Sequence, residues 1–423
     1  MIPATLAQGL RPVRTELANG VVILAQESGT VPAVTINATF FAGSAQDPVD
    51  LPGVAYLTRR VIDRGAANRS AVQIADALDD RGVSLRVTAA RDTFSVACDC
   101  LSEDLDDLLA LISDVVRAPL FPQLELDKRR VEAITSVRQD DDNPAVRSID
   151  ALVGTLYGLA HPYGRPFKGT VASLQSIGRA HLLEFHRQRL QPSSLRLAIV
   201  GDVDPVAAVE AGSRFFESWS GTPVRENALP APPAARARSV MCQLMPGKSQ
   251  TDIGYGFTAV RRLDPRYYAY WMMNNILGQF GLGGRLADNI RERQGMAYYA
   301  YSTLEARVSE GPLIIRAGVD PGHVERTIEA IDREVSDLGR TGPTLAEFED
   351  TRQSLIGSIP RMLETNDGIG EFLLGAEQFG LGLDHDRRLP DLLRAVTRDE
   401  VHEAAAEVLD PSKASIVVAG PSA

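Results

Sequence analysis

The sequence has few cysteines, no long apolar run and no excess of positive charge. Its three cysteines, Cys98, Cys100 and Cys242, are too few for a disulfide framework. Cys98 and Cys100 are two residues apart in an alternating segment, so we interpret them as small hydrophobic residues on one strand face. No apolar run approaches the roughly 18 residues that cross a bilayer. The formal net charge of −11 argues against nucleic-acid binding, which needs a basic patch.

The first residues, MIPATLAQGL, lack the basic region and the apolar core of a secretory signal peptide. Thr5-Leu6-Ala7 before Gln8 resembles the end of a cleavage site. On this basis we expect a periplasmic protein, with the cytoplasm as the alternative. No membrane span and no nucleic-acid partner are expected.

The chain contains one internal duplication. Residues 192–201 (PSSLRLAIVG) correspond to 411–420 (PSKASIVVAG), at an offset of 219. At the same offset, an alternating strand at 94–100 matches one at 313–319, and an apolar helical stripe at 105–116 matches one at 324–335. Ser102 and Asp320 are suitable residues to begin these two helices.

With 423 residues, the chain is long enough for more than one core. Adjacent strands followed by blocks of helices predict an α+β fold. We expect two homologous domains, 1–220 and 240–423, each with a mainly antiparallel sheet flanked by helices. The segment 221–239, rich in proline and alanine, is the predicted linker.

Five segments carry a resemblance to a known family. They are LPGVAYLTRRVI (51–62), RQDDDNP (138–144), HPYGRPFKGT (161–170), LRLAIVGD (195–202) and GGRLADNIRERQGMAYYAYS (283–302). Together with the duplication, they make the chain similar to the pitrilysin–insulinase group of inverzincin peptidases, which includes mitochondrial processing peptidase. The resemblance extends from about Arg11 to Val418.

Active members of that family carry H-x-x-E-H on a helix, where two histidines bind zinc and the glutamate acts as general base. The resemblance places Tyr56, Arg59 and Arg60 at those positions, and Ser136 at or beside the position of a third, glutamate ligand. Arginine offers only donors and stays protonated, so it neither binds a cation nor accepts a proton. We therefore expect no metal in this chain. His181 and His186, five residues apart, form no recognised zinc pair.

The resemblance also implies a functional pair in the second half. Arg291 and Tyr298 match an arginine/tyrosine pair that hydrogen-bonds substrate near the scissile carbonyl in active relatives. Guanidinium and phenol groups are suitable donors for the negative charge that builds on that oxygen. By spacing alone, the two would be an ordinary solvated helix residue and a strand residue. At the equivalent positions of the first half stand Leu78 and Leu85.

A glycine-rich segment, GQFGLGGR (278–285), precedes Arg291. Glycines let backbone approach a ligand closely, and the resemblance implies substrate contact at Gly281, Gly283 and Gly284. The terminal Lys-Ser/Thr of a phosphate-binding loop is missing. In the first half, the strand expected at 83–90 is the equivalent of the sheet edge that binds substrate in relatives.

These features predict the subunit without zinc of a heterodimeric metalloendopeptidase. Its zinc-bearing paralogue would hold the metal, peptides would be the substrates, and this chain alone would be inactive. Two alternatives stay open: a non-enzymatic structural subunit similar to the core proteins of respiratory complexes, and a homodimeric peptide-binding protein.

Overall fold

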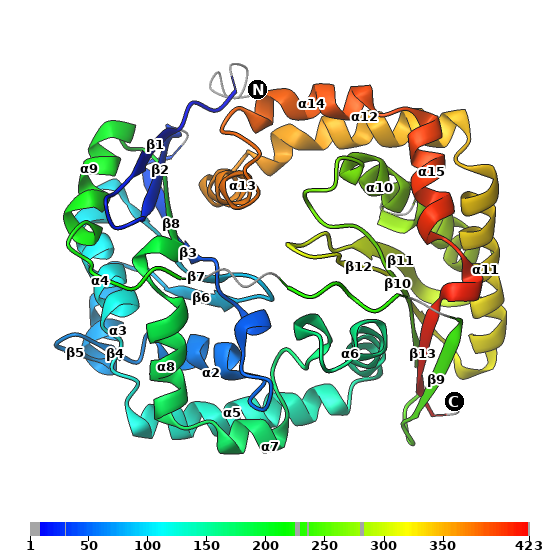
Figure 1. Ribbon diagram of the computed structural model, residues 1–423, viewed down its shortest axis with the longest axis horizontal. Helices are drawn as coiled ribbons and strands as arrows, with labels where there is room; N and C mark the ends of the chain where they lie inside the picture. Colours follow the sequence, from blue (N-terminus) through cyan, green and yellow to red (C-terminus); the bar gives the residue numbers. More distant parts are fainter. Residues whose placement is uncertain (1–8, 30, 225–228, 235–236, 280–282, 422–423) are drawn as a thin grey trace. The chain divides into compact units, whose positions relative to one another are not determined.

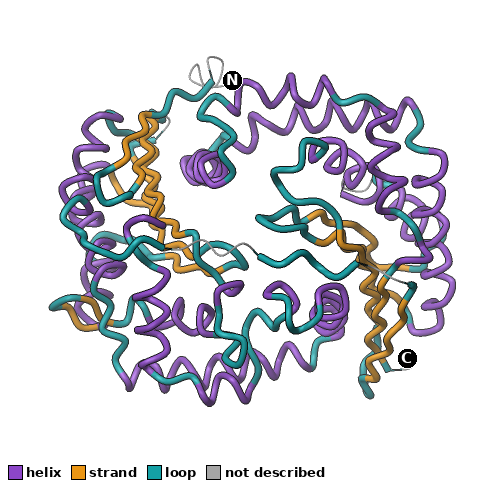
Figure 2. The backbone as a smooth tube through the Cα atoms, in the orientation of Figure 1, coloured by secondary structure: helices purple, strands orange, loops and turns teal. Residues whose placement is uncertain are grey.

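A computed structural model describes residues 9–421 apart from 30, 225–228, 235–236 and 280–282. The chain forms two compact units, and in each of them helices pack around one main sheet (Figures 1 and 2). The predicted α+β fold with two similar halves is confirmed. Unit 1 consists of Met1–Thr135, Pro166–Asn227 and Ser358–Arg388, and unit 2 of Ser136–Arg165, Ala228–Gly357 and Leu389–Ala423.

The main sheet of unit 1 has six strands in the order β1-β2-β8-β3-β7-β6, and only β2 and β8 run parallel. Its core side is apolar, as in β3, where Val34, Ile36, Ala38 and Phe40 are fully buried. The strands are β1 (Val13–Glu16), β2 (Val22–Glu27), β3 (Ala33–Phe40), β6 (Arg86–Ala89), β7 (Phe94–Leu101) and β8 (Leu195–Gly201), with a separate hairpin of β4 (Gly65–Ala66) and β5 (Arg69–Ser70).

The helices of unit 1 are α2 (Val54–Val61), α3 (Ala71–Asp79), α4 (Leu105–Arg117), α7 (Val171–Ser176), α8 (Arg179–Arg189), α9 (Pro205–Phe216) and α13 (Asn366–Gln378). Three helices run from one unit into the other: α5 (Gln123–Asp141), α12 (Leu345–Met362) and α14 (His385–Ala395). Short 3₁₀ turns lie at Ser44–Gln46, Ser102–Asp104, Pro162–Gly164, Pro192–Ser194, Pro321–His323 and Pro411–Lys413.

The sheet of unit 2 repeats this strand order as β11-β12-β10-β13-β9, with only β13 and β9 parallel. Its strands are β9 (Ser239–Leu244), β10 (Thr251–Thr258), β11 (Ala297–Leu304), β12 (Pro312–Val319) and β13 (Ser415–Gly420). Its helices are α6 (Pro144–Tyr157), α10 (Tyr267–Asn274), α11 (Val324–Thr341) and α15 (Arg398–Val408), together with π-helical segments at Asn275–Gln279 and Ala287–Arg293.

The elements predicted from the duplication are present. The paired strands are β7 and β12, the paired helices are α4 and α11, and β6 is an edge strand, as β11 is in unit 2. Asp320 accepts a hydrogen bond from the Gly322 amide and so begins the turn before α11. The prediction that Ser102 caps α4 is wrong, because Ser102 begins a 3₁₀ turn and α4 has no side-chain cap.

Each unit contains a helix from the other half of the sequence. Helix α6 packs on β10 and β13 in unit 2, and α13 packs on β8 and β3 in unit 1. Gly254 and Gly256 on β10 allow the close approach, since a Cβ on Gly256 would lie 3.0 Å from Leu152 Cδ2. The boundaries 1–220 and 240–423 thus describe the repeat in the sequence, whereas each compact unit is built from segments of both halves of the sequence. Part of the predicted linker, 225–228 and 235–236, lies outside the described residues.

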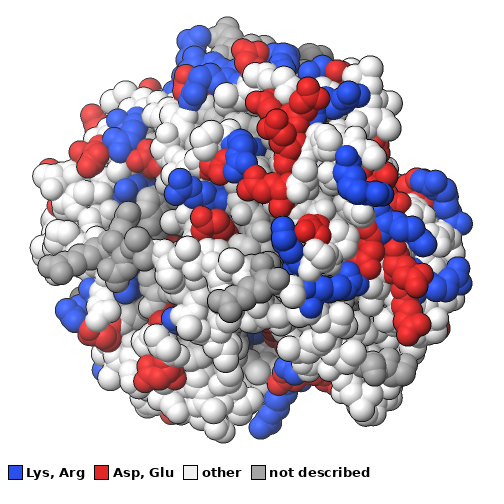
Figure 3. Space-filling view, turned by 45° about the vertical axis from the view of Figure 1, so that its right-hand side comes forward, with Lys and Arg blue, Asp and Glu red and all other residues white. Residues whose placement is uncertain are grey.

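Two surface properties bear on function. Among the described residues, none of the helices combines the length and apolar character needed to cross a bilayer. On the face drawn in Figure 3, basic side chains lie among acidic ones.

Candidate functional site

Helix α2 carries Tyr56, Arg59 and Arg60, which the resemblance places at the zinc-motif positions. Its first turn is fixed by Asp47, whose carboxylate accepts hydrogen bonds from the Gly53 amide (2.7 Å) and the Ala55 amide (2.8 Å). Tyr56 is 1% exposed, and its ring meets Phe167 edge to face at 5.8 Å. An aromatic side chain therefore fills the space at the first of these positions.

The two arginines that follow Tyr56 are held by its ring and by a carboxylate. The Arg59 guanidinium lies over the Tyr56 ring, 4.7 Å from the centroid, and donates a long hydrogen bond of 3.5 Å to the Val87 carbonyl of the edge strand β6. Arg60 pairs with Glu132 of α5 at 2.8 Å, and Arg129 pairs with the same carboxylate at 2.7 Å. Contact with an aromatic face and charge-assisted hydrogen bonds to a carboxylate suit guanidinium groups.

These side chains do not fit a zinc ion. Zinc in proteins takes thiolate, imidazole or carboxylate ligands, whereas α2 offers a buried phenol and two permanent cations. Ser136 follows Glu132 by one turn on α5 and brings a hydroxyl in place of a carboxylate. Within the described part of the chain, no three His, Cys, Asp or Glu residues gather as metal ligands do.

His181 and His186 have structural roles. The Gly178 amide donates to His181 Nδ1 at 2.9 Å at the start of α8. His186 Nε2 lies 2.7 Å from the Val116 carbonyl, and burial lowers the pKa of this imidazole. Each histidine thus contacts backbone.

In unit 2, Tyr298 lies at an irregularity of the edge strand β11. Ala297 pairs with Val319 and Tyr299 with the adjacent Gly318, so Tyr298 is the extra residue of a β-bulge. A bulge changes the direction of a side chain, and the Tyr298 side chain is 70% exposed. Its neighbour Tyr299 is anchored instead, since its phenol donates to the buried Asp252. The phenol of Tyr298 therefore faces open space beside a fixed residue.

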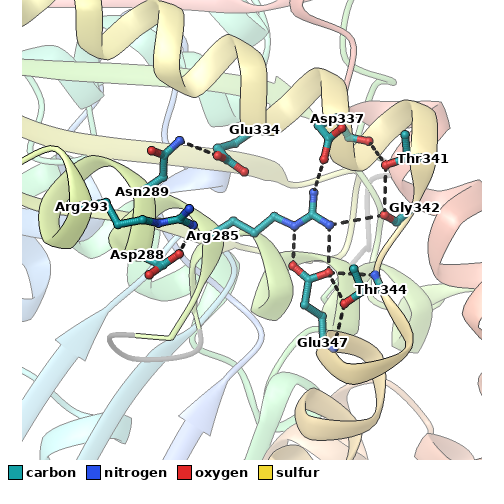
Figure 4. Close-up of polar contacts among 10 residues, drawn as sticks. All are labelled: Arg285, Asp288, Asn289, Arg293, Glu334, Asp337, Thr341, Gly342, Thr344 and Glu347. Atoms are coloured by element: carbon teal, nitrogen blue, oxygen red, sulfur yellow. Dashed lines mark hydrogen bonds and ion pairs between the residues drawn. The ribbon is translucent and has the colours of Figure 1, made fainter.

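Arg291 lies in the π-helical segment Ala287–Arg293. Polar contacts of neighbouring residues tie this segment to α11 and α12 (Figure 4). At its start, Arg285 pairs with Glu347 of α12 at 2.6 Å and with Asp337 of α11 at 3.0 Å. Asn289 donates to Glu334 of α11 at 2.5 Å. The Arg291 side chain is 44% exposed, with Nε 3.5 Å from Glu292 Oε1.

Seven residues separate Arg291 from Tyr298, and the chain turns between them at Gly295, which has a φ of +63°. A left-handed conformation of this kind costs glycine little. Among the described residues, no hydrogen bond joins the side chains of Arg291 and Tyr298. The guanidinium and the phenol therefore do not occupy each other as hydrogen-bond partners.

The glycine-rich segment is described only in part. Gly281 lies outside the described residues, and Gly283 is exposed. Gly284 is buried, and a Cβ on it would lie 2.8 Å from the Cα of Gly278. At least this glycine is thus required by close backbone packing.

Two further residues, one in each unit, escaped the sequence analysis. The pairing of Glu132 with Arg60 has only a weak signal, namely the helical spacing of Arg129 and Glu132. Asp252 stands in the buried strand β10, where a carboxylate is unusual and therefore suggests a specific partner.

Comparisons with known proteins point to one family of peptidases. The family model described as insulinase (peptidase family M16) matches residues 22–170, and that described as peptidase M16 inactive domain matches residues 176–355. An uncharacterized zinc protease of Mycobacterium leprae is 27% identical over 97% of this chain and 92% of its own length. One of Streptomyces coelicolor is 26% identical over 96% of this chain and 89% of its own.

Solved structures show the same fold. A crystal structure described as a peptidase M16 inactive domain, from Pseudomonas fluorescens, superposes with a TM-score of 0.91 at 26% identity, covering 98% of both chains. A protease from Helicobacter pylori gives a TM-score of 0.89 at 16% identity, covering 97% of this chain and 99% of its own. Because the two family models together span most of the sequence, the chain belongs to the insulinase family of M16 peptidases.

Proposed function

We propose that this chain is the subunit without zinc of a heterodimeric metalloendopeptidase, and that a paralogue carrying H-x-x-E-H holds the metal. One contrast carries the proposal. Helix α2 presents Tyr56, Arg59 and Arg60 where zinc ligands would stand, while β11 presents the exposed phenol of Tyr298 at a bulge. If one chain binds zinc and the other donates hydrogen bonds to the substrate, the second chain can lose its metal ligands but must keep exposed donors. This chain has that combination.

Arg291 and Tyr298 would act on substrate held in the complex. Attack of water on a peptide carbonyl places negative charge on its oxygen, and preorganised N–H and O–H donors stabilise that charge. Tyr298 supplies one O–H, and Arg291 supplies a guanidinium that stays protonated. The attacking water would come from the zinc-bearing partner. Gly283 and Gly284 would border the substrate path.

The partner and the compartment belong to the same proposal. The family relationship supports pairing with a paralogue, and the periplasm is the compartment that we propose for the pair. Peptides would be its substrates.

The experiment mixes the purified chain with its H-x-x-E-H paralogue and follows cleavage of a fluorogenic peptide. Tyr298→Phe and Arg291→Ala should each lower kcat by about 100-fold, because one donor to the developing charge is lost. Tyr301→Phe removes another exposed phenol of β11, and Arg293→Ala removes another exposed guanidinium of the same segment. Both control variants should keep kcat.

Full activity of Tyr298→Phe and Arg291→Ala would refute their role. Zinc-dependent cleavage by the isolated chain would refute its inactivity. Size-exclusion chromatography of the same mixture tests the heterodimer, since the proposal requires a complex larger than either chain.

A further inference from the structure

Unit 1 contains a pocket of about 270 Å³ between α13 and the polar side of its sheet. Two cross-strand rows form its base. Asn37, Ala97 and Arg86 are aligned across β3, β7 and β6, and so are Thr39, Ser95 and Thr88. One face of α13, from Asp367 to Gln378, lies opposite. The pocket has this volume because the residues that face its centre are small, namely Ala97 on β7 and Gly375 on α13.

The floor of the pocket has an unused hydrogen-bond donor. Thr39 Oγ1 donates to Asn37 Oδ1 at 2.8 Å and lies 2.7 Å from Ser95 Oγ. Since the single hydroxyl hydrogen of Thr39 goes to Asn37, Ser95 donates to Thr39. Asn37 is only 7% exposed, yet its Nδ2 has no partner among the described residues. This nitrogen is not among the fully buried polar atoms that lack a partner, so it is accessible from the pocket, where a ligand or water can accept its hydrogen bond.

The rim of the pocket has an unused carboxylate. Arg86 is occupied, because it pairs with Asp99 and, at 2.8 Å, with Asp367. Glu371, one turn after Asp367 on α13, forms no ion pair or hydrogen bond among the described residues. Burial raises the pKa of Glu371, and the nearby Asp367 raises it further. A positive charge at this rim would favour the ionised carboxylate.

We infer that this pocket binds a basic side chain of a peptide, with its charge against Glu371 and a peptide carbonyl on the Asn37 amide. A ligand that satisfies both groups needs a positive charge and a hydrogen-bond acceptor. A peptide with an arginine or lysine has both, since every residue supplies a carbonyl. This inference rests on the proposed function, because it names the class of peptide that the complex would receive. It concerns peptide binding by unit 1 and makes no claim about the rate of cleavage.

The test measures binding to the isolated full chain by isothermal titration calorimetry. The probes are a blocked alanine–serine heptapeptide with one central arginine and the same peptide with citrulline, which is neutral and nearly equal in shape. The wild-type chain should bind the arginine peptide about fivefold more tightly, as expected for one partly exposed ion pair. Glu371→Gln should abolish this preference, whereas Glu364→Gln, an exposed acid of the same unit outside the pocket, should keep it.

Ala97→Leu, which fills the pocket, should weaken binding of both peptides alike. Equal affinities of the wild-type chain for the two peptides, or no binding of either, would overturn the inference. An equal effect of Glu364→Gln and Glu371→Gln would overturn it too. Cleavage is not read out, so loss of the arginine preference is distinguishable from failure of Arg291 and Tyr298 in the peptidase assay.

Discussion

The phenol of Tyr299 donates a hydrogen bond to the carboxylate of Asp252, whose side chain is 2% exposed. The Tyr299 ring also covers Gly318 of β12, where an added Cβ would lie 2.6 Å from Tyr299 Cε1. These two contacts fix the residue next to the bulge. Asp252 and Gly318 are therefore positioning residues for Tyr298, although neither touches its side chain.

We expect Gly318→Ala to lower kcat of the complex by about tenfold or more. The added methyl group displaces the Tyr299 ring and with it the bulge, and small misplacements of catalytic groups are costly. Peptide hydrolysis with the zinc-bearing paralogue measures the effect. Gly357→Ala on α12, where an added Cβ meets nothing within 4 Å, is the control and should leave kcat unchanged. Unchanged kcat in Gly318→Ala would show that the anchoring of Tyr299 is not needed.

Asp252 should also give a pH-dependent contribution to stability. Burial raises the pKa of its carboxyl above the ordinary 3.8 in the folded state. The folded state then binds the proton more tightly than the unfolded state, so this contribution is largest below pH 3.8 and falls as pH rises to the folded pKa. The free energy of unfolding of the wild type, minus that of Asp252→Asn, should therefore decrease from acidic to neutral pH. Urea unfolding across that range measures it, and a rising difference would contradict the assignment.

The isolated chain should hold no stoichiometric zinc after dialysis, as measured by mass spectrometry of the metal. The side chains at four positions cannot bind zinc or activate its water. The combined variant Tyr56→His, Arg59→Glu, Arg60→His and Ser136→Glu restores suitable groups and should bind zinc. Omission of Ser136→Glu from this variant should weaken binding, because one ligand is lost. A tightly bound zinc in the wild type would show that the chain has ligands elsewhere.

Glu132→Ala should reduce the free energy of unfolding by about 0.5–1 kcal/mol, since Arg60 and Arg129 lose their shared, partly exposed carboxylate. The loss should shrink at high salt, which screens the repulsion between the two guanidinium groups. Urea unfolding at low and high ionic strength provides the measurement. Glu184→Ala breaks one exposed ion pair, with Arg187, and an exposed hydrogen bond from Gln188, so it should cost less. Equal losses in the two variants would argue against a special role of Glu132.

The regular elements of the fold could be predicted from the sequence because they have local signals. The alternation at 94–100 and the stripe at 105–116 correspond to β7 and α4, and their duplicates to β12 and α11. The exchange of α6 and α13 between the halves had no local signal. A helix shows in its sequence that one face is apolar, but not which of two similar sheets will receive it.

The candidate site was predictable in part for the same reason. The chemistry of Arg59 and Arg60 follows from residue type, so the misfit with zinc could be read from the sequence. The bulge at Tyr298 depends on the register between β11 and β12 and on the contact of Tyr299 with Asp252, which lies 47 positions away in the sequence. The pocket under α13 needs the exchanged helix and could not be foreseen without it.

The exchange of helices has a consequence for how the chain can be cut. A fragment ending in the linker would retain β3 and β8 but lose α13, and would leave their polar side bare. Its complement would lack α6 and would leave the glycine-lined β10 open to water. Neither fragment should fold alone. The two fragments should reach the native state only when they are produced together, because each supplies the helix that the other lacks.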